Sequence, residues 1–294
     1  MPAVNANGIT IEYESLGAAE APAIFLIMGL GMQLTAWPDP FCEALFKQGF
    51  RVIRFDNRDI GLSSKMEGLG VPNLAWASVR SWLGLSVHSG YLLSDMAADT
   101  VGLMDALGIR AAHVVGVSMG GMIAQMVAAL YPQRTSSLTS IMSTTGSTHL
   151  PRPSGEVVKT LLSRPTNPRD PQSVVDHYMK LFGVIGSPGF PIEETELRQR
   201  LEKSVLRSYY PAGSARQLLA IIASGDRTRL LATIKAPTLV IHGVNDPLIP
   251  VEAGKDTAAK ITGAKLQLVQ GMGHDMAAWP LLAEAIVSRC RHAW

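Results

Sequence analysis

The stretch AHVVGVSMGGMIAQ, residues 112–125, places Ser118 between Gly116 and Gly120, after an apolar run and before a second one. A nucleophile at a sharp strand-to-helix turn needs tiny residues two positions before and after it. Larger side chains would collide where the strand and the helix approach each other. The N–H groups that open the helix then favour negative charge on the serine oxygen. The context predicts a nucleophile at Ser118, although a glycine-bracketed turn without chemistry also has this pattern.

The uncharged run 111–131 that contains this stretch is long enough to span a bilayer on length alone. His113, Ser118, Gln125 and three glycines interrupt it, and its first part is β-branched. A strand that turns into a buried helix is the better interpretation. The first residues, MPAVNANGITIEYESLG, have neither the basic nor the apolar region of a signal peptide. We therefore expect a cytoplasmic protein that does not act at a membrane.

Charge and cysteine usage exclude several other classes of function. The formal net charge is +2 with charges of both signs dispersed, so we expect no nucleic-acid partner. Cys42 and Cys290 form no CxxC pair, which argues against a disulfide framework or a zinc site. The sequence shows no metal-ligand cluster and no glycine-rich dinucleotide loop, so we expect no metal and no cofactor.

Short apolar runs alternate with helical patterns over most of the chain. Such alternation predicts the α/β class, with a mostly parallel, doubly wound sheet and helices on both faces. The helix over 93–108 should begin with Ser94 as N-cap and end with Gly108 as C-cap. The expected strands are 9–16, 23–29, 51–56, 112–117, 136–144, 237–243 and 264–271; the other expected helices are 39–49, 120–132, 251–261 and 276–292.

Residues 146–232 break this alternation. They are rich in Pro, Arg and Gly, carry helical patterns, and far exceed the dozen or so residues that a parallel crossover needs. We expect them to form a mainly helical cap inserted into a core domain of residues 1–145 and 233–294. A lid-like insertion at 65–92 contains Trp76 and Trp82. These two indoles either line the mouth of a pocket or pack a surface helix onto the core.

A nucleophilic serine needs a general base, and the base needs a carboxylate to orient it. His274 follows the expected strand 264–271 and precedes the last helix, and Asp246 follows the strand 237–243. The order Ser118, Asp246, His274 is the one that this class of fold uses. Asp275 is the obvious competitor for the acid, but as the neighbour of His274 it is poorly placed to reach the imidazole from behind.

The chain resembles the α/β-hydrolase superfamily over nearly its whole length. The resemblance lies in the glycine turn after AIFLI, in DNRDIGLSS at 56–64, and in GVSMGG, HGVNDPLIP and GMGHDM. Within the superfamily it is similar to capped serine ester hydrolases of the aclacinomycin methylesterase and carboxylesterase-like group. We interpret Asp56, Asn57 and Arg58 as structural residues that brace the turn after the expected strand 51–56.

The resemblance implies an oxyanion hole made of two backbone N–H groups. One belongs to the residue after the nucleophile, here Met119. The other belongs to the stretch Met28-Gly29-Leu30-Gly31, in which Met28 stands where histidine is common. Leu30 is the preferred donor, with Gly31 as the alternative.

The leading hypothesis is a serine hydrolase that cleaves carboxylic esters of small to medium apolar substrates through an acyl-enzyme. The same three residues could instead serve a cofactor-free haloperoxidase or perhydrolase, or a lactonase. A different class of function is a non-catalytic small-molecule binding protein on the same fold. The natural ester is not predicted, and the oligomeric state, including a homodimer, stays open.

Overall fold

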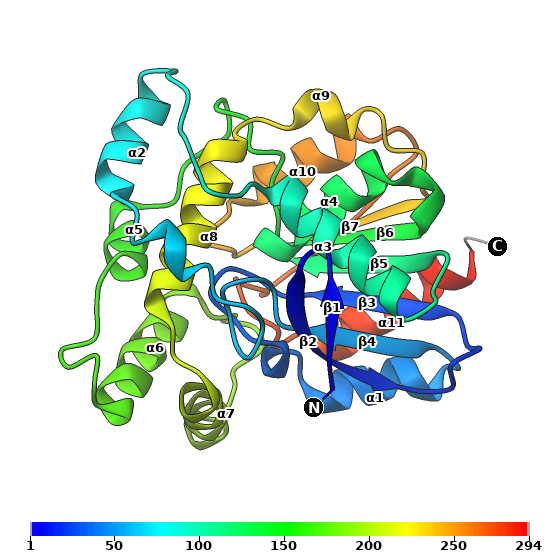
Figure 1. Cartoon of the computed structure of the whole chain (residues 1–294), viewed down its shortest axis with the longest axis horizontal. Helices are drawn as coiled ribbons and strands as arrows, with labels where there is room; N and C mark the ends of the chain where they lie inside the picture. Colours follow the sequence, from blue (N-terminus) through cyan, green and yellow to red (C-terminus); the bar gives the residue numbers. More distant parts are fainter. Residues whose placement is uncertain (1, 293–294) are drawn as a thin grey trace.

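An eight-stranded sheet forms the centre of the computed structural model, which describes residues 2–292. The strand order is β1-β2-β4-β3-β5-β6-β7-β8 (Figure 1). β1 and β2 pair antiparallel, as do β2 and β4, and the remaining neighbours are parallel. This confirms the predicted α/β fold. The strands are β1 (Ala3–Ala6), β2 (Ile9–Leu16), β3 (Ala23–Ile27), β4 (Arg51–Phe55), β5 (Ala112–Val117), β6 (Thr135–Ile141), β7 (Thr238–Gly243) and β8 (Lys265–Val269).

Helices cover both faces of the sheet because its central strands are apolar on both sides. In β3, Phe25 and Ile27 pack into one core with α3 and α4, while Ile24 and Leu26 pack into a second core with α1 and α11. α10 lies on the same side as α3 and α4 (Figure 1). The bounds of these helices are α1 (Asp39–Lys47), α3 (Leu93–Ala106), α4 (Met119–Leu130), α10 (Val251–Lys260) and α11 (Trp279–Arg291). Single-turn 3-10 helices span Leu34–Ala36, Glu67–Leu69 and Pro132–Arg134.

The caps of α3 differ from the expectation at both ends, by two residues at the start and by one at the end. Its N-cap is Leu92, and Ser94 lies inside the first turn, so the expected cap at Ser94 is wrong. The carboxylate of Asp95 accepts the backbone N–H of Leu92 at 2.7 Å and satisfies the helix start in its place. At the other end Gly108 has φ +68° and follows the C-cap residue Leu107, where glycine carries no steric penalty.

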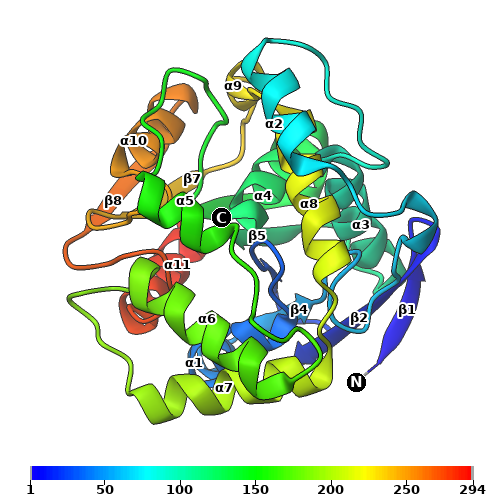
Figure 2. The same ribbon diagram turned by 90° about the vertical axis from the view of Figure 1, so that its left-hand side faces the viewer.

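Residues 146–232, which we call the cap, contain helices and no strand among the residues that the structure describes. Their helices are α5 (Gly155–Leu161), α6 (Pro171–Ile185), α7 (Glu194–Arg207), α8 (Pro211–Ser224) and α9 (Thr228–Leu231). α6 and α7 pack together through a small apolar cluster that includes Val174, Val175, Leu201 and Val205. α5 to α8 lie to one side of the sheet (Figures 1 and 2).

The segment 65–92 carries α2 (Leu74–Trp82), which packs against α8 (Figure 2). Trp76 is 60% exposed and Trp82 is 73% exposed, so neither indole packs onto the core. Neither of them lines the cavity described below.

The uncharged run 111–131 forms β5 and the buried helix α4. Across residues 2–292, every helix is too short or too polar to cross a membrane.

Candidate active site

Ser118 occupies the turn between β5 and α4 with φ +54° and ψ −121°, a conformation that a residue with a side chain rarely adopts. A Cβ at Gly116 would lie 2.0 Å from the carbonyl oxygen of Gly120. A Cβ at Gly120 would lie 2.0 Å from the carbonyl oxygen of Ile27. Both contacts are impossible, so the turn requires glycine at both positions.

The strained turn is held from the neighbouring strand β6. The Ser118 N–H donates to the carbonyl of Ile141 at 2.9 Å, and the Ser143 hydroxyl donates to the carbonyl of Ser118 at 2.8 Å. Ser143 is buried, and a Cβ at Gly121 would lie 2.6 Å from the Cβ of Ser143. Sequence reasoning missed Ser143, whose only signal is its position just beyond β6, next to the end of β5.

The structure brings Ser118, His274 and Asp246 together in one chain of hydrogen bonds. Nε2 of His274 lies 3.0 Å from Oγ of Ser118, and Nδ1 of His274 lies 2.7 Å from Oδ2 of Asp246. Oδ1 of Asp246 accepts the N–H groups of Leu248 and Ile249 at 2.9 and 2.8 Å. The three side chains follow β5, β7 and β8, whose carboxyl ends meet at one edge of the sheet. This arrangement can pass the serine proton to the imidazole.

His242 lies next to Asp246 but does not take part in this series of hydrogen bonds. Its Nε2 is 2.8 Å from the carbonyl of Ile249, which it meets as a donor, and 3.7 Å from Oδ2 of Asp246. Burial lowers the pKa of His242, so the ring is neutral near pH 7. Of the two histidines, His274 is the close partner of the Asp246 carboxylate, because it lies at 2.7 Å and His242 at 3.7 Å.

Asp275 turns away from the imidazole of its neighbour. Its Oδ2 accepts the N–H of Ser187 at 2.9 Å, and its Oδ1 accepts the Ser187 hydroxyl at 2.5 Å and the N–H of Ala277 at 3.0 Å. The N–H of His274 in turn donates to the carbonyl of Ile185, at the end of α6. Asp275 thus joins the loop that carries His274 to the cap, a role that sequence reasoning missed together with Ser187.

A tight turn at 29–32 lies against Ser118. The Met32 N–H donates to the carbonyl of Gly29 at 3.2 Å, and Gly31 has φ +70°, as a type II turn requires at its third residue. A Cβ at Gly29 would lie 3.3 Å from Cβ of Ser118. The Gly31 N–H already donates to Oε1 of Gln217 at 2.9 Å. The Leu30 N–H is therefore the better candidate for an oxyanion donor, beside that of Met119 at the start of α4.

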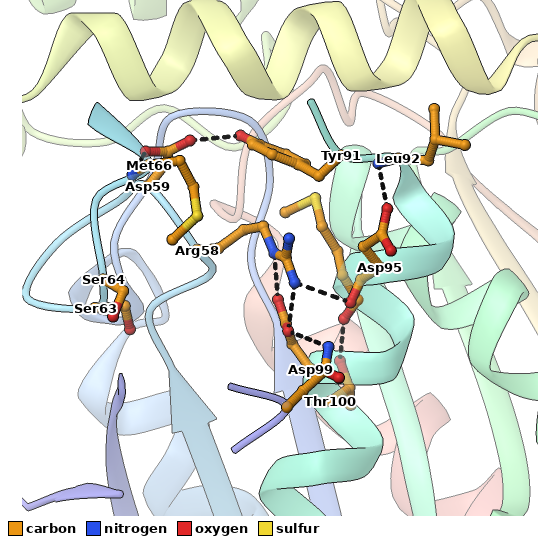
Figure 3. A network of polar contacts seen from close by, with 12 residues as sticks. Arg58, Asp59, Ser63, Ser64, Met66, Tyr91, Leu92, Asp95, Asp99 and Thr100 are labelled. Carbon is orange, nitrogen blue, oxygen red and sulfur yellow. Dashed lines mark hydrogen bonds and ion pairs between the residues drawn. The ribbon is translucent and has the colours of Figure 1, made fainter. Parts of the chain in front are cut away.

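The side chains of the turn 56–59 form hydrogen bonds and ion pairs with the backbone of residues 28–34 and with neighbouring helices. Oδ1 of Asp56 accepts the N–H of Leu34 at 2.8 Å, and its Oδ2 pairs with Arg207 of α7 at 2.7 Å. The Asn57 side chain donates to the carbonyl of Met28 at 3.0 Å. Arg58 makes two 2.6 Å hydrogen bonds to Asp99 of α3, as Figure 3 shows. Each side chain thus braces a backbone turn or a neighbouring helix.

Asp59 extends this bracing to the cap. Its carboxylate is fully buried and accepts two hydrogen bonds from Arg216 of α8, at 2.9 and 2.6 Å. It accepts another from the hydroxyl of Tyr91 at 2.8 Å (Figure 3). Burial alone would raise the pKa of Asp59, but Arg216, the Met66 N–H and Tyr91 outweigh it and hold that pKa below its usual value. Sequence reasoning did not identify this ion pair.

A cavity of about 180 Å³ opens over Ser118 and His274. Its walls are mostly apolar and come from two sources, the core loops and the cap. The lining residues include Met28, Leu30, Met142, Leu248 and Met276 from the core, and Leu161, Leu181, Phe182, Ile185, Leu197, Arg200 and Leu201 from the cap. Such a cavity suits a small apolar molecule whose reactive atom lies next to the serine.

Comparisons with known proteins agree with this architecture. The chain is 27% identical to the rhodomycin D methylesterase DnrP of Streptomyces peucetius, over 97% of this chain and 96% of that protein. It is 29% identical to the putative carbamate hydrolase RutD of Pantoea ananatis strain LMG 20103, over 90% of this chain and 86% of that protein.

Among solved structures, the chain is similar to a mutant of the meta-cleavage product hydrolase CumD from Pseudomonas fluorescens IP01, complexed with acetates. The TM-score is 0.78 at 20% identity, with 100% of this chain and 98% of that chain covered. The family model for the alpha/beta hydrolase fold matches residues 22–280. On the sheet, the turn at Ser118 and this match, the chain belongs to the alpha/beta hydrolase fold family.

Proposed function

We propose that this protein is a serine hydrolase that cleaves carboxylic esters of small to medium apolar substrates through an acyl-enzyme. The observation that carries the proposal is the hydrogen-bonded chain of Ser118, His274 and Asp246 at the floor of an apolar cavity. Similarity to a rhodomycin D methylesterase over nearly the full chain supports ester hydrolysis at the general level.

In the first half-reaction, Oγ of Ser118 attacks the ester carbonyl carbon while its proton passes to Nε2 of His274. The carbonyl oxygen becomes an oxyanion, which the N–H groups of Met119 and Leu30 stabilise. Asp246 stabilises the imidazolium through its 2.7 Å contact with Nδ1. The tetrahedral intermediate collapses, the bond to the alcohol oxygen breaks, and His274 returns the proton to the leaving alcohol.

In the second half-reaction, water takes the place of the alcohol. His274 accepts a proton from the water as its oxygen attacks the acyl carbon, and a second oxyanion forms in the same site. Collapse of this intermediate releases the carboxylic acid, and the proton returns to Oγ of Ser118. The cavity walls bury the acyl or alcohol group, and the cavity of about 180 Å³ favours groups of modest size.

The test compares hydrolysis of p-nitrophenyl acetate, butyrate, octanoate and palmitate by the wild type, Ser118→Ala and Ser81→Ala. Ser81 is an exposed serine of α2 and serves as the matched control. We expect Ser118→Ala to lose nearly all activity and Ser81→Ala to keep it. Wild-type turnover that survives in Ser118→Ala would refute the proposed mechanism. A wild type that neither turns over the esters nor reacts with a fluorophosphonate at Ser118 would favour a binding protein.

A further inference from the structure

Gln217 lies on α8 of the cap, far along the chain from the turn at 29–32, and its side chain is fully buried. We propose that Gln217 is a positioning residue for the oxyanion hole, and that the cap therefore supplies part of the catalytic geometry as well as a pocket wall. The inference rests on the proposed serine hydrolase function, because it assigns a role to the same oxyanion site.

The side-chain amide of Gln217 bridges two core turns. Its Oε1 accepts the N–H of Gly31 at 2.9 Å, and its Nε2 donates to the carbonyl of Arg58 at 2.8 Å. One end meets a donor and the other an acceptor, so only one orientation of the amide satisfies both. Gln217 therefore ties the turn at 29–32 to the braced turn at 56–59.

The Leu30 N–H lies between two anchored groups. On one side Asn57 holds the carbonyl of Met28 at 3.0 Å, and on the other Gln217 holds the N–H of Gly31. Without the second anchor the peptide groups around Leu30 gain freedom to rotate. An oxyanion donor is effective only when it points at the place where the charge develops, so such freedom weakens transition-state stabilisation.

The helix that carries Gln217 is itself fixed to the core. The preceding residue, Arg216, makes the buried ion pair with Asp59, and the side-chain exposures are 4% and 0%. A Cβ at Gly213 of the same helix would lie 2.1 Å from the carbonyl of Asp59, so α8 packs directly on this turn. The position of Gln217 is thus held by contacts of the helical turn that precedes it.

The first experiment measures kcat and KM of Gln217→Met on p-nitrophenyl butyrate. We expect kcat to fall about 10- to 100-fold, less than the roughly 100- to 1000-fold loss when an oxyanion donor is removed, because the donor stays and loses only its alignment; KM should change less than about threefold. The affinity for a trifluoromethyl ketone, which forms a tetrahedral adduct with Ser118, should fall by the same factor as kcat.

Gln33→Met is the matched control. Gln33 is also a buried glutamine between core and cap, and its amide contacts the carbonyls of Ser204 and Ser208 rather than the turn. We expect Gln33→Met to lower the Tm as Gln217→Met does but to keep kcat within about twofold. Equal losses of kcat in both variants would show a general packing effect and overturn the inference.

Gln217→Glu provides a second readout, which also decides the matter if Gln217→Met does not fold. A neutral glutamic acid can accept from Gly31 and donate to Arg58, whereas its carboxylate places negative charge near the oxyanion. The ratio of its kcat to that of the wild type should therefore rise as the pH falls. A ratio that is flat with pH, or wild-type kcat in this variant, contradicts the positioning role. Both outcomes presuppose activity that depends on Ser118, so they are distinct from a failure of the proposed function.

Discussion

The carboxylate of Asp246 lies 2.7 Å from Nδ1 of His274, although the two residues are 28 positions apart in the chain. Asp275, which directly follows His274, instead directs its carboxylate at Ser187 in the loop after α6. The geometry thus gives the two aspartates different roles: one faces the imidazole, and the other holds the loop that carries it.

Asp246→Asn should lower kcat by about three orders of magnitude or more, because an amide cannot stabilise the imidazolium and favours the wrong tautomer of His274. Asp275→Asn should lower kcat less than about tenfold, since it disturbs the contacts of the loop with Ser187 and Ala277 and none with the imidazole. Steady-state kinetics on p-nitrophenyl butyrate separate the two. The acid assignment is wrong if Asp275→Asn proves the more damaging change.

Arg216→Met should destabilise the protein by about 3–5 kcal/mol, because it leaves the carboxylate of Asp59 buried without its partner. The double variant with Asp59→Asn should recover part of that loss, since the uncompensated charge is then removed. Urea unfolding of the two single variants and the double variant gives the coupling free energy. Strictly additive losses would mean that the ion pair is not the source of the effect.

His113 should make the stability depend on pH. Burial lowers its pKa to about 4, below the ordinary value of 6.5, so the folded state resists protonation that the unfolded state accepts. The resulting stabilisation is complete above pH 6.5 and is lost as the pH falls from 6.5 towards 4.

By this linkage the advantage of the wild type over His113→Asn should shrink between pH 7 and pH 4.5. The change in the difference of unfolding free energies is on the order of 2–3 kcal/mol. Denaturant unfolding at the two pH values measures it. A difference that does not vary with pH would show that His113 is protonated equally in both states.

Leu201 should set part of the size limit of the cavity, because it lines the cavity from α7 and is almost fully buried. Leu201→Trp is expected to lower kcat/KM for p-nitrophenyl octanoate relative to acetate by about tenfold or more, since it fills space that a longer chain needs. Leu206→Trp on the same helix is the control, as Leu206 is 74% exposed. An unchanged preference in Leu201→Trp would place the acyl chain elsewhere.

The fold was predictable because its signals are local. Each parallel strand is a short apolar run followed by a turn, and the carboxyl ends of such strands meet at one edge of the sheet. The positions of Ser118, Asp246 and His274 after their strands therefore sufficed to predict that they would meet. The need for glycine at 116 follows from sterics within the turn, whereas Gly120 is also required by the carbonyl of Ile27 on a neighbouring strand.

The contacts between cap and core were not predictable in the same way. Gly31 and Gln217 are 186 positions apart, and a glutamine in a helix carries no local sign of its partner. The same holds for Asp59 and Arg216, 157 positions apart. Near the start of α3 both Ser94 and Asp95 can cap the helix, and it is Asp95 that accepts the N–H of Leu92. The local sequence pattern predicts the helices and strands, whereas the partners of side chains that are far apart in the sequence depend on how those elements pack.

The turn at 56–59 has a consequence for exchanging segments between relatives. Three side chains of the cap contact this turn. Arg207 pairs with Asp56, Arg216 pairs with Asp59, and Gln217 donates to the carbonyl of Arg58. A chimera that takes the cap from one homologue and the core from another would separate these partners unless both parents share them. Recombination between homologues should therefore succeed when residues 56–59 and 207–217 are inherited together.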